Sequence, residues 1–126
     1  MSRTVLGPTG TPYSIGLKVF GAETIYVAGH LAVDPDGRVV APGDMEGQAR
    51  YIFAAIGKLL KEAGGSLSDV VKITAYITTL EGYASYGTVR RAVFGDMLPT
   101  SATLQVAGLV IPGCLIEIEA IAVLGM

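Results

Sequence analysis

Cysteine and histidine are nearly missing from this sequence. Its 126 residues include one cysteine, Cys114, and one histidine, His30. A single cysteine excludes an internal disulfide framework, and these two residues are too few to form a cluster of zinc ligands. We interpret Cys114 as a small buried hydrophobic residue, and we expect neither a metal nor another cofactor.

Positive charge is scarce as well. Nine Lys and Arg against eleven Asp and Glu give a net charge of −2, and the basic residues form no stripe. Proteins that bind phosphate backbones normally carry a clustered positive surface, so we expect no nucleic-acid partner. No apolar run approaches the roughly 20 residues of a membrane span, and residues 1–14 have no apolar signal core. We expect a soluble, cytoplasmic protein without a membrane partner.

Apolar residues are abundant, at 51% of the chain against 16% charged residues. This composition is too apolar for a disordered chain, and the length predicts one domain over residues 1–126. Because a small domain has much surface for its volume, the apolar excess favours a homo-oligomer.

The first forty residues predict a β-meander. Weak alternation over 13–20 and a β-branched, aromatic run over 24–33 indicate two strands. The sequence DPDG at 34–37 is typical of a turn. Residues 38–40 are then expected to return as a short antiparallel strand.

Two helices are predicted, one on each side of a strand. Asp44 is expected to cap the first helix, and Gly64 and Gly65 to end it. Its buried face is predicted from an apolar stripe of Met45, Ala49, Ile52, Phe53, Ile56, Leu59, Leu60 and Ala63. The second helix is expected over 83–94, with Tyr86, Val89, Val93 and Arg90 on related faces.

Three more strands complete the predicted order. In the strand at 70–78, one face is expected to carry Val71, Ile73, Ala75 and Ile77, and the other Val70, Lys72, Thr74, Tyr76 and Thr78. Residues 102–111 and 115–123 follow as strands, joined by a turn at 112–113. The resulting order, β-β-β-α-β-α-β-β, predicts an α+β fold whose two helices cover one sheet face.

Two glutamates lie inside the last predicted strand. Period two places Ile116 and Ile118 on one face and Glu117 and Glu119 on the other. A carboxylate in apolar surroundings is costly unless it is compensated. The smooth apolar face should meet the helices, so the acidic face meets solvent, a partner subunit or a pocket between subunits.

Six segments carry a family resemblance through their order and spacing. They are PYS at 12–14, AGHLAVDPDG at 28–37, QAR at 48–50, AGGSLSDVVKITAYITTL at 63–80, Pro99, and IEIEAIAV at 116–123. Together they resemble the RidA family, also called YjgF/YER057c/UK114. The resemblance implies a chorismate-mutase-like (YjgF-like) α+β fold with a mixed sheet, and a homotrimer with a central barrel and clefts between subunits. Glu117 and Glu119 would then lie on the inter-subunit face.

The resemblance also implies a chemistry. Members of that family hydrolyse reactive enamines and imines to a 2-oxo acid and ammonia. Glu117 falls on the glutamate that positions or deprotonates the attacking water. The pocket tyrosine, supplied by the adjacent subunit, falls on Tyr13. A Ser-Gly pair near pocket backbone amides falls on Ala28 and Gly29, so only the glycine is retained.

The family pattern fails at the residue that binds the substrate carboxylate. Where the family reads Pro-x-Arg-Ser, this chain has Ser101 in place of the arginine, Thr103 two residues later, and Gly87 in place of an asparagine. Loss of such a charged partner typically costs about 1.5–3 kcal/mol, so we expect little activity on ordinary amino-acid-derived imines. The other cations weighed as replacements are Arg50, Lys72, Arg90 and Arg91, of which Arg90 is preferred.

Each candidate residue also has a structural interpretation. Glu117 could form a salt bridge at a subunit seam, and Tyr13 could cover the core with its ring. Ser101 and Thr103 could bond the backbone where a strand begins. A lone histidine such as His30 is usually structural or exposed.

Two functions stay open at this level. The first is a divergent deaminase or hydrolase whose substrate lacks a simple carboxylate or has it bound differently. The second is a non-catalytic trimeric protein that binds a small metabolite. Ribonuclease activity, attached to some relatives, is disfavoured because no basic groove is indicated. Chorismate mutase chemistry is disfavoured because no cations cluster.

Overall fold

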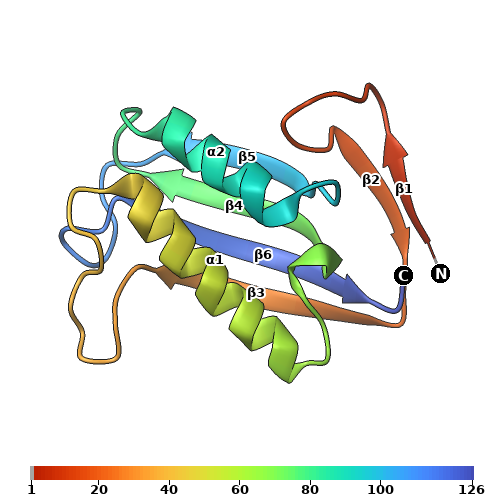
Figure 1. The fold of residues 1–126 in the computed structure, drawn as a ribbon, viewed down its shortest axis with the longest axis horizontal. Coiled ribbons are helices and arrows are strands. Elements are labelled where there is room, and N and C mark those ends of the chain that lie inside the picture. Colours follow the sequence, from red (N-terminus) through yellow and green to blue (C-terminus); the bar gives the residue numbers. More distant parts are fainter. Residues whose placement is uncertain (1) are drawn as a thin grey trace.

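The computed structural model describes residues 2–126 and has a four-stranded mixed sheet at its centre (Figure 1). Its strand order is β3 (Glu23–Leu31), β6 (Ile116–Leu124), β4 (Val70–Ile77) and β5 (Thr100–Gln105). Strands β4 and β5 are parallel, and the other neighbours are antiparallel. Helices α1 (Met45–Glu62) and α2 (Tyr83–Phe94) lie on the same face of this sheet. The predicted α+β fold is confirmed.

Helix α1 begins and ends at the expected residues. The Asp44 side chain accepts a hydrogen bond from the Gly47 backbone N–H at 3.0 Å, as an N-cap should. After the helix, Gly64 has φ +85°, a conformation that glycine adopts without strain. The caps therefore fix both ends of the longest element over the sheet.

The buried face of α1 differs from the predicted stripe in three residues. Leu59 and Ala63 are exposed, whereas Gln48 is fully buried. The Gln48 amide donates to the carbonyls of Ala41 and Gly113 and accepts from the Leu115 N–H at 2.8 Å. A buried amide satisfied in this way joins α1 to the loop that leads into β6.

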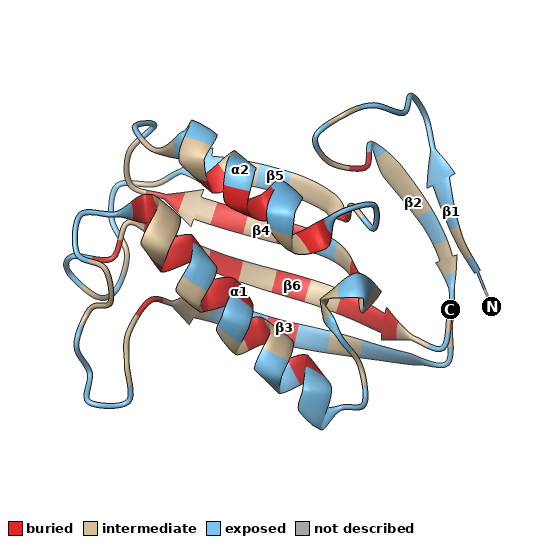
Figure 2. Ribbon diagram, viewed as in Figure 1, coloured by how far each residue is buried: buried red, intermediate tan, exposed pale blue. Residues whose placement is uncertain are grey.

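Alternation along the strands gives the sheet a covered face and an open face. The residues of β6 that are buried beneath the helices are Ile116, Ile118, Ala120 and Ala122 (Figure 2). Glu117 and Glu119 lie between them on the open face, as predicted. On β4, Val70 is buried although we expected it on the other face. The register with β6 shifts between Val70 and Lys72, which turns that end of the strand.

The N-terminal region contradicts the predicted meander. Strand β1 (Ser2–Leu6) was not predicted, and it pairs with β2 (Gly16–Phe20) in a separate two-stranded sheet. Strand β3 pairs with β6 instead of with its neighbours in sequence. Residues 38–40 form no strand and contribute one bridge, between Val33 and Val39. The Asp34 carboxylate accepts hydrogen bonds from the backbone N–H groups of Asp36 and Arg38. These local bonds favour a turn over pairing with a neighbouring strand.

Strand β5 is shorter than the predicted strand over 102–111. It ends at Gln105, and the Val106 N–H bonds the carbonyl of Ile77, the last residue of β4. Because β5 is an edge strand, it has no ladder to continue once β4 ends. A short 3₁₀ helix, η1 (Leu67–Asp69), leads into β4 and was also not predicted.

Candidate active site

Glu117 lies on the open face of the sheet, next to Gly29. It is paired with Leu31 of β3 and Tyr76 of β4. The register between β3 and β6 shifts between Val27 and His30, so β3 bulges at Gly29. A Cβ built on Gly29 would lie 2.9 Å from the Glu117 carboxyl carbon and would overlap the carboxylate. The absence of a side chain therefore lets Glu117 lie against the β3 backbone.

The carboxylate of Glu117 borders a pocket of about 320 Å³, together with Tyr76, Glu119 and residues of the loop after β5. The Tyr76 hydroxyl donates to Glu119 Oε1 at 2.7 Å, and this bond raises the pKa of Tyr76 because it holds the phenolic proton. Glu119 is thus occupied. Within residues 2–126, no side chain forms a hydrogen bond or ion pair with Glu117.

Four other predicted site residues line a second pocket, of about 370 Å³, between α2 and β5. They are Tyr13, Arg90, Ser101 and Thr103. Arg90 Nη1 donates to Ser101 Oγ at 3.2 Å. The Arg90 guanidinium carbon lies 5.2 Å from the ring centre of Tyr13 and 5.3 Å from that of Tyr86, within the range of cation–π contacts.

Arg90 differs from the other cations considered as replacements for the missing arginine. Arg50, Lys72 and Arg91 are exposed, whereas Arg90 is 3% exposed. Among the residues that the structure describes, no carboxylate forms an ion pair with it. Its Nε and the Tyr86 hydroxyl are both buried without a hydrogen-bond partner in this part of the chain. Burial raises the pKa of Tyr86, and the charge of Arg90 offsets part of that change.

The six candidate residues form two groups on opposite faces of the sheet. Ser101 is paired with Ile73, whose side chain is buried beneath the helices, and it bonds Arg90 on that side. Glu117 is paired with Tyr76 and lies on the open face with Gly29. One chain therefore brings Tyr13, Arg90, Ser101 and Thr103 together, and separately Glu117 and Gly29, and it does not join the two groups.

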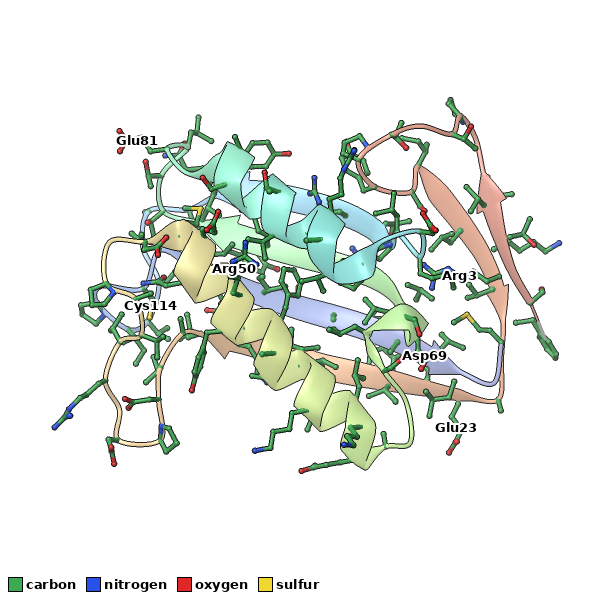
Figure 3. The ribbon with its side chains drawn as sticks, viewed as in Figure 1. Arg3, Glu23, Arg50, Asp69, Glu81 and Cys114 are labelled. Carbon is green, nitrogen blue, oxygen red and sulfur yellow. The ribbon has the colours of Figure 1, made fainter. Side chains whose placement is uncertain are left out.

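The remaining residues of interest have local roles. His30 Nδ1 lies 2.7 Å from the carbonyl of Ala28, two residues before it. Cys114 is buried in the loop before β6 (Figure 3), as expected, and burial raises the pKa of its thiol. Residues 2–126 hold no cluster of His, Cys, Asp or Glu that could bind a metal. No helix in this range is long and apolar enough to cross a bilayer.

Two residues of the second pocket were missed from the sequence, although a signal for each existed. Tyr83 lies three residues before Tyr86 and seven before Arg90, which is the spacing of one helix face. Gln105 continues the alternation of Ser101 and Thr103 along β5. Extension of the helical spacing to Tyr83 and of the strand alternation to Gln105 would have included both residues among the candidates.

Comparisons with known proteins agree on one family. The family model described as endoribonuclease L-PSP matches residues 7–124. A RutC family protein of Pyrococcus abyssi is 38% identical over 111 residues, which are 88% of this chain and 85% of the relative. A 2-iminobutanoate/2-iminopropanoate deaminase of Rattus norvegicus is 34% identical over 126 residues, which are 98% of this chain and 91% of the relative.

Solved structures support the same assignment. A protein of the conserved Rid family from Yersinia pestis superposes with a TM-score of 0.87 at 26% identity, covering 98% of this chain and 100% of that one. RidA from an Antarctic Psychrobacter superposes with a TM-score of 0.74 at 34% identity, covering 94% and 92%. The chain belongs to the endoribonuclease L-PSP family, which is the RidA (YjgF/YER057c/UK114) family.

Proposed function

We propose that the protein is a deaminase that hydrolyses a C=N bond or the enamine related to it. Two observations support this proposal. The rat relative is named a 2-iminobutanoate/2-iminopropanoate deaminase. The carboxylate of Glu117 lies unpartnered against the glycine backbone at Gly29 and borders a pocket. The second observation carries the proposal, because it supplies a base where water could be bound.

The proposed reaction adds one water to the imine and releases one ammonia. Glu117 accepts a proton from the water as its oxygen bonds to the imine carbon. Glu117 passes that proton to the nitrogen, which gives a carbinolamine. The hydroxyl proton is then transferred to the amino group by the same carboxylate as the C–N bond breaks, and a carbonyl product leaves with ammonia. An enamine first gains a proton on carbon and loses one from nitrogen to become the imine. This chemistry requires a positioned water and one carboxylate, and it requires no cofactor.

We further propose that the working site lies between two copies of the chain in a homotrimer. The group containing Tyr13, Ser101 and Thr103 would come from one subunit, and Glu117 with Gly29 from the next. The separation of these groups on opposite sheet faces supports this, since neither is a complete site. The open face also exposes large apolar side chains, with Tyr26 79%, Leu104 47% and Val110 83% exposed. Contact with other subunits would cover them.

The substrate is proposed to be atypical in how its carboxylate is held. Ser101 stands where the family motif has arginine, and a hydroxyl cannot replace a bidentate guanidinium. The substrate therefore either lacks a carboxylate at that position or has it bound by another residue. Ribonuclease activity is not proposed, although the family model carries that name, because the chain has a net charge of −2.

The test of the proposed activity is release of ammonia and of a 2-oxo acid from a short-lived imine made in the assay. Glu117→Gln keeps the shape of the side chain and removes the base, so we expect the rate above the buffer background to fall at least about 100-fold. Glu119→Gln is the matched control on the same strand and face. The control should retain most of the rate, because the Glu119 carboxylate is engaged by Tyr76. Equal rates in wild type and Glu117→Gln would refute the role of Glu117.

A non-catalytic metabolite-binding protein is the second candidate, and the serine at position 101 is what favours it. Such a protein would keep the pocket between α2 and β5 after losing turnover. Calorimetry with 2-iminobutanoate mimics, followed by recovery of the ligand, separates the two functions. A bound compound returned unchanged, with no ammonia released from any imine, would favour the binding protein.

A further inference from the structure

The guanidinium of Arg90 is a buried positive charge that the chain itself does not compensate. Arg90 is 3% exposed, and no carboxylate of residues 2–126 lies within ion-pair distance. Arginine is almost never fully buried unless it is paired, because removal of the charge from water is costly. A group held in this state in a folded protein indicates that a negative charge is supplied from elsewhere.

The surroundings of Arg90 leave several of its donors available. A guanidinium has five N–H donors, and one hydrogen bond, from Nη1 to Ser101 Oγ, is made within the described residues. The rings of Tyr13 and Tyr86 lie close to it, at 5.2 and 5.3 Å, and shield it from solvent. The side chain nevertheless borders the pocket between α2 and β5. Among the described residues, Arg90 Nε and the Tyr86 hydroxyl are both buried without a hydrogen-bond partner.

The position of this charge connects it with the missing arginine. By the family motif, Ser101 occupies the place of the carboxylate-binding residue. In the structure, the Arg90 guanidinium reaches from α2 to within 3.2 Å of the Ser101 hydroxyl. In the family motif the positive charge comes from an arginine on the strand. Here it comes from Arg90 on helix α2, but it lies beside Ser101, the residue that occupies the arginine's place.

We propose that Arg90 binds the carboxylate of the substrate, in the pocket that it shares with Ser101 and Thr103. This deepens the proposed function and rests on it. It assigns the substrate to the small 2-imino carboxylic acids and replaces our expectation of little activity on such compounds. A carboxylate fits better than a larger anion, because the planar fork of arginine pairs with it bidentately and the Ser101 and Thr103 hydroxyls can donate alongside.

Calorimetric titration with 2-oxobutanoate, the carbonyl product expected from 2-iminobutanoate, tests the assignment directly. Arg90→Met retains the length and apolar character of the side chain without its charge. We expect this variant to bind at least about tenfold more weakly than the wild type. Arg91→Met is the matched control, because it removes an equal charge from the exposed neighbouring residue. Its affinity should equal that of the wild type.

Restoration of the charge on the strand gives a second test. The double variant Arg90→Met/Ser101→Arg places a guanidinium at the position of the family motif. We expect it to recover most of the affinity lost in Arg90→Met, and to recover kcat/KM for imine hydrolysis with it. A purely structural role of Arg90 would not be rescued by a charge on another element.

The outcomes separate the two proposals. Binding that requires Arg90, in a wild type that releases no ammonia, would keep Arg90 as the carboxylate-binding residue and refute the deaminase. Turnover and binding unchanged in Arg90→Met, or no binding of 2-oxobutanoate by the wild type, would overturn the role of Arg90. If Arg90→Met does not fold, the Nε–Hε resonance of Arg90 in the wild type decides. It should shift as 2-oxobutanoate is added, and a stationary resonance overturns the assignment.

Discussion

Gly29 matters to the candidate site because it has no side chain. The Glu117 carboxylate occupies the volume that a Cβ at this position would need. The backbone of β3 bulges here, and the glycine is exposed on the open face. The position of the proposed base therefore depends on a neighbouring strand as much as on its own.

Gly29→Ala should consequently impair catalysis more than stability. The added methyl overlaps the carboxylate, so the Glu117 side chain must rotate away from its position. Since misplacement of a reacting group by about 1 Å can cost on the order of 100-fold, we expect kcat to fall by at least tenfold. The melting temperature should change by only a few degrees, because the side chain of Glu117 is flexible and half-buried.

Gly16→Ala is the control for that substitution. A Cβ at Gly16 would meet Leu6 at 3.4 Å, an ordinary contact, and the residue lies in β2 away from both pockets. Steady-state kinetics and thermal unfolding of both variants make the comparison. Retention of full kcat by Gly29→Ala would show that the position of Glu117 does not depend on this glycine.

The sequence predicted some of these residues better than others. Alternation alone placed Glu117 on the face opposite the helices, and the resemblance joined it to Gly29. The burial of Arg90 could not be deduced, because a helical period places a residue on a face without showing whether a counter-charge lies there. The two tyrosine rings beside it come from segments distant in sequence, Tyr13 and Tyr86.

Among the elements, the N-terminal hairpin is held to the rest of the chain by Arg3, together with hydrogen bonds of Ser14 and Ala22. Arg3 on β1 donates four hydrogen bonds to backbone carbonyls at 3.0–3.1 Å, two from each terminal nitrogen (Figure 3). The acceptors are Ser68, Val70, Met97 and Leu98. Partial burial lowers the pKa of Arg3. The loop of this hairpin, between β1 and β2, carries the Tyr13 ring that lies beside Arg90, so this contact also supports the second pocket.

Arg3→Met should loosen this hairpin. We expect the free energy of unfolding to fall by about 2 kcal/mol, since bonds from a charged donor are lost but the site is partly open to water. Hydrogen exchange should accelerate in β1 and β2 while the core of β6 stays protected. Lys18→Met, which removes an exposed charge from β2, is the control and should change neither quantity. A loss of stability without faster exchange in the hairpin would contradict this role of Arg3.

The predicted ends of the strands were wrong where the pairing strand, and not the residue types, determines where a strand begins or ends. Strand β1 has weak local signals and exists because β2 lies beside it. Strand β5 stops where β4 stops, although apolar residues continue to 111. The helices, whose hydrogen bonds are internal, were predicted closely by their caps and periodicity. Strand ends depend on a neighbouring strand, which the local pattern does not reveal.

For the whole molecule, the same limit applies to assembly. Apolar composition indicated an oligomer, and the structure adds an open sheet face with exposed Tyr26 and Val110. The division of the candidate site supports the proposal of a cleft shared between subunits, because Arg90 and Glu117 lie on opposite faces of one sheet. Neither composition nor periodicity could have shown that division. The division of the site between subunits predicts how mixtures of two variants behave, which no single variant can test.

Two inactive variants should restore each other when their subunits are exchanged. If each cleft takes Arg90 from one subunit and Glu117 from the next, a 1:1 mixture of Arg90→Met and Glu117→Gln, unfolded and refolded together, should regain about a quarter of wild-type activity, because each half of a cleft is intact with even odds. Ammonia release per subunit is the measurement. Native mass spectrometry of the refolded mixture shows whether mixed oligomers have formed. Wild type refolded with the double variant Arg90→Met/Glu117→Gln should fall from about half to about a quarter of the wild-type activity, because a shared cleft then needs two wild-type subunits. If mixed oligomers form, but the single variants stay inactive together and the wild-type mixture stays near half, the whole reaction takes place within one chain.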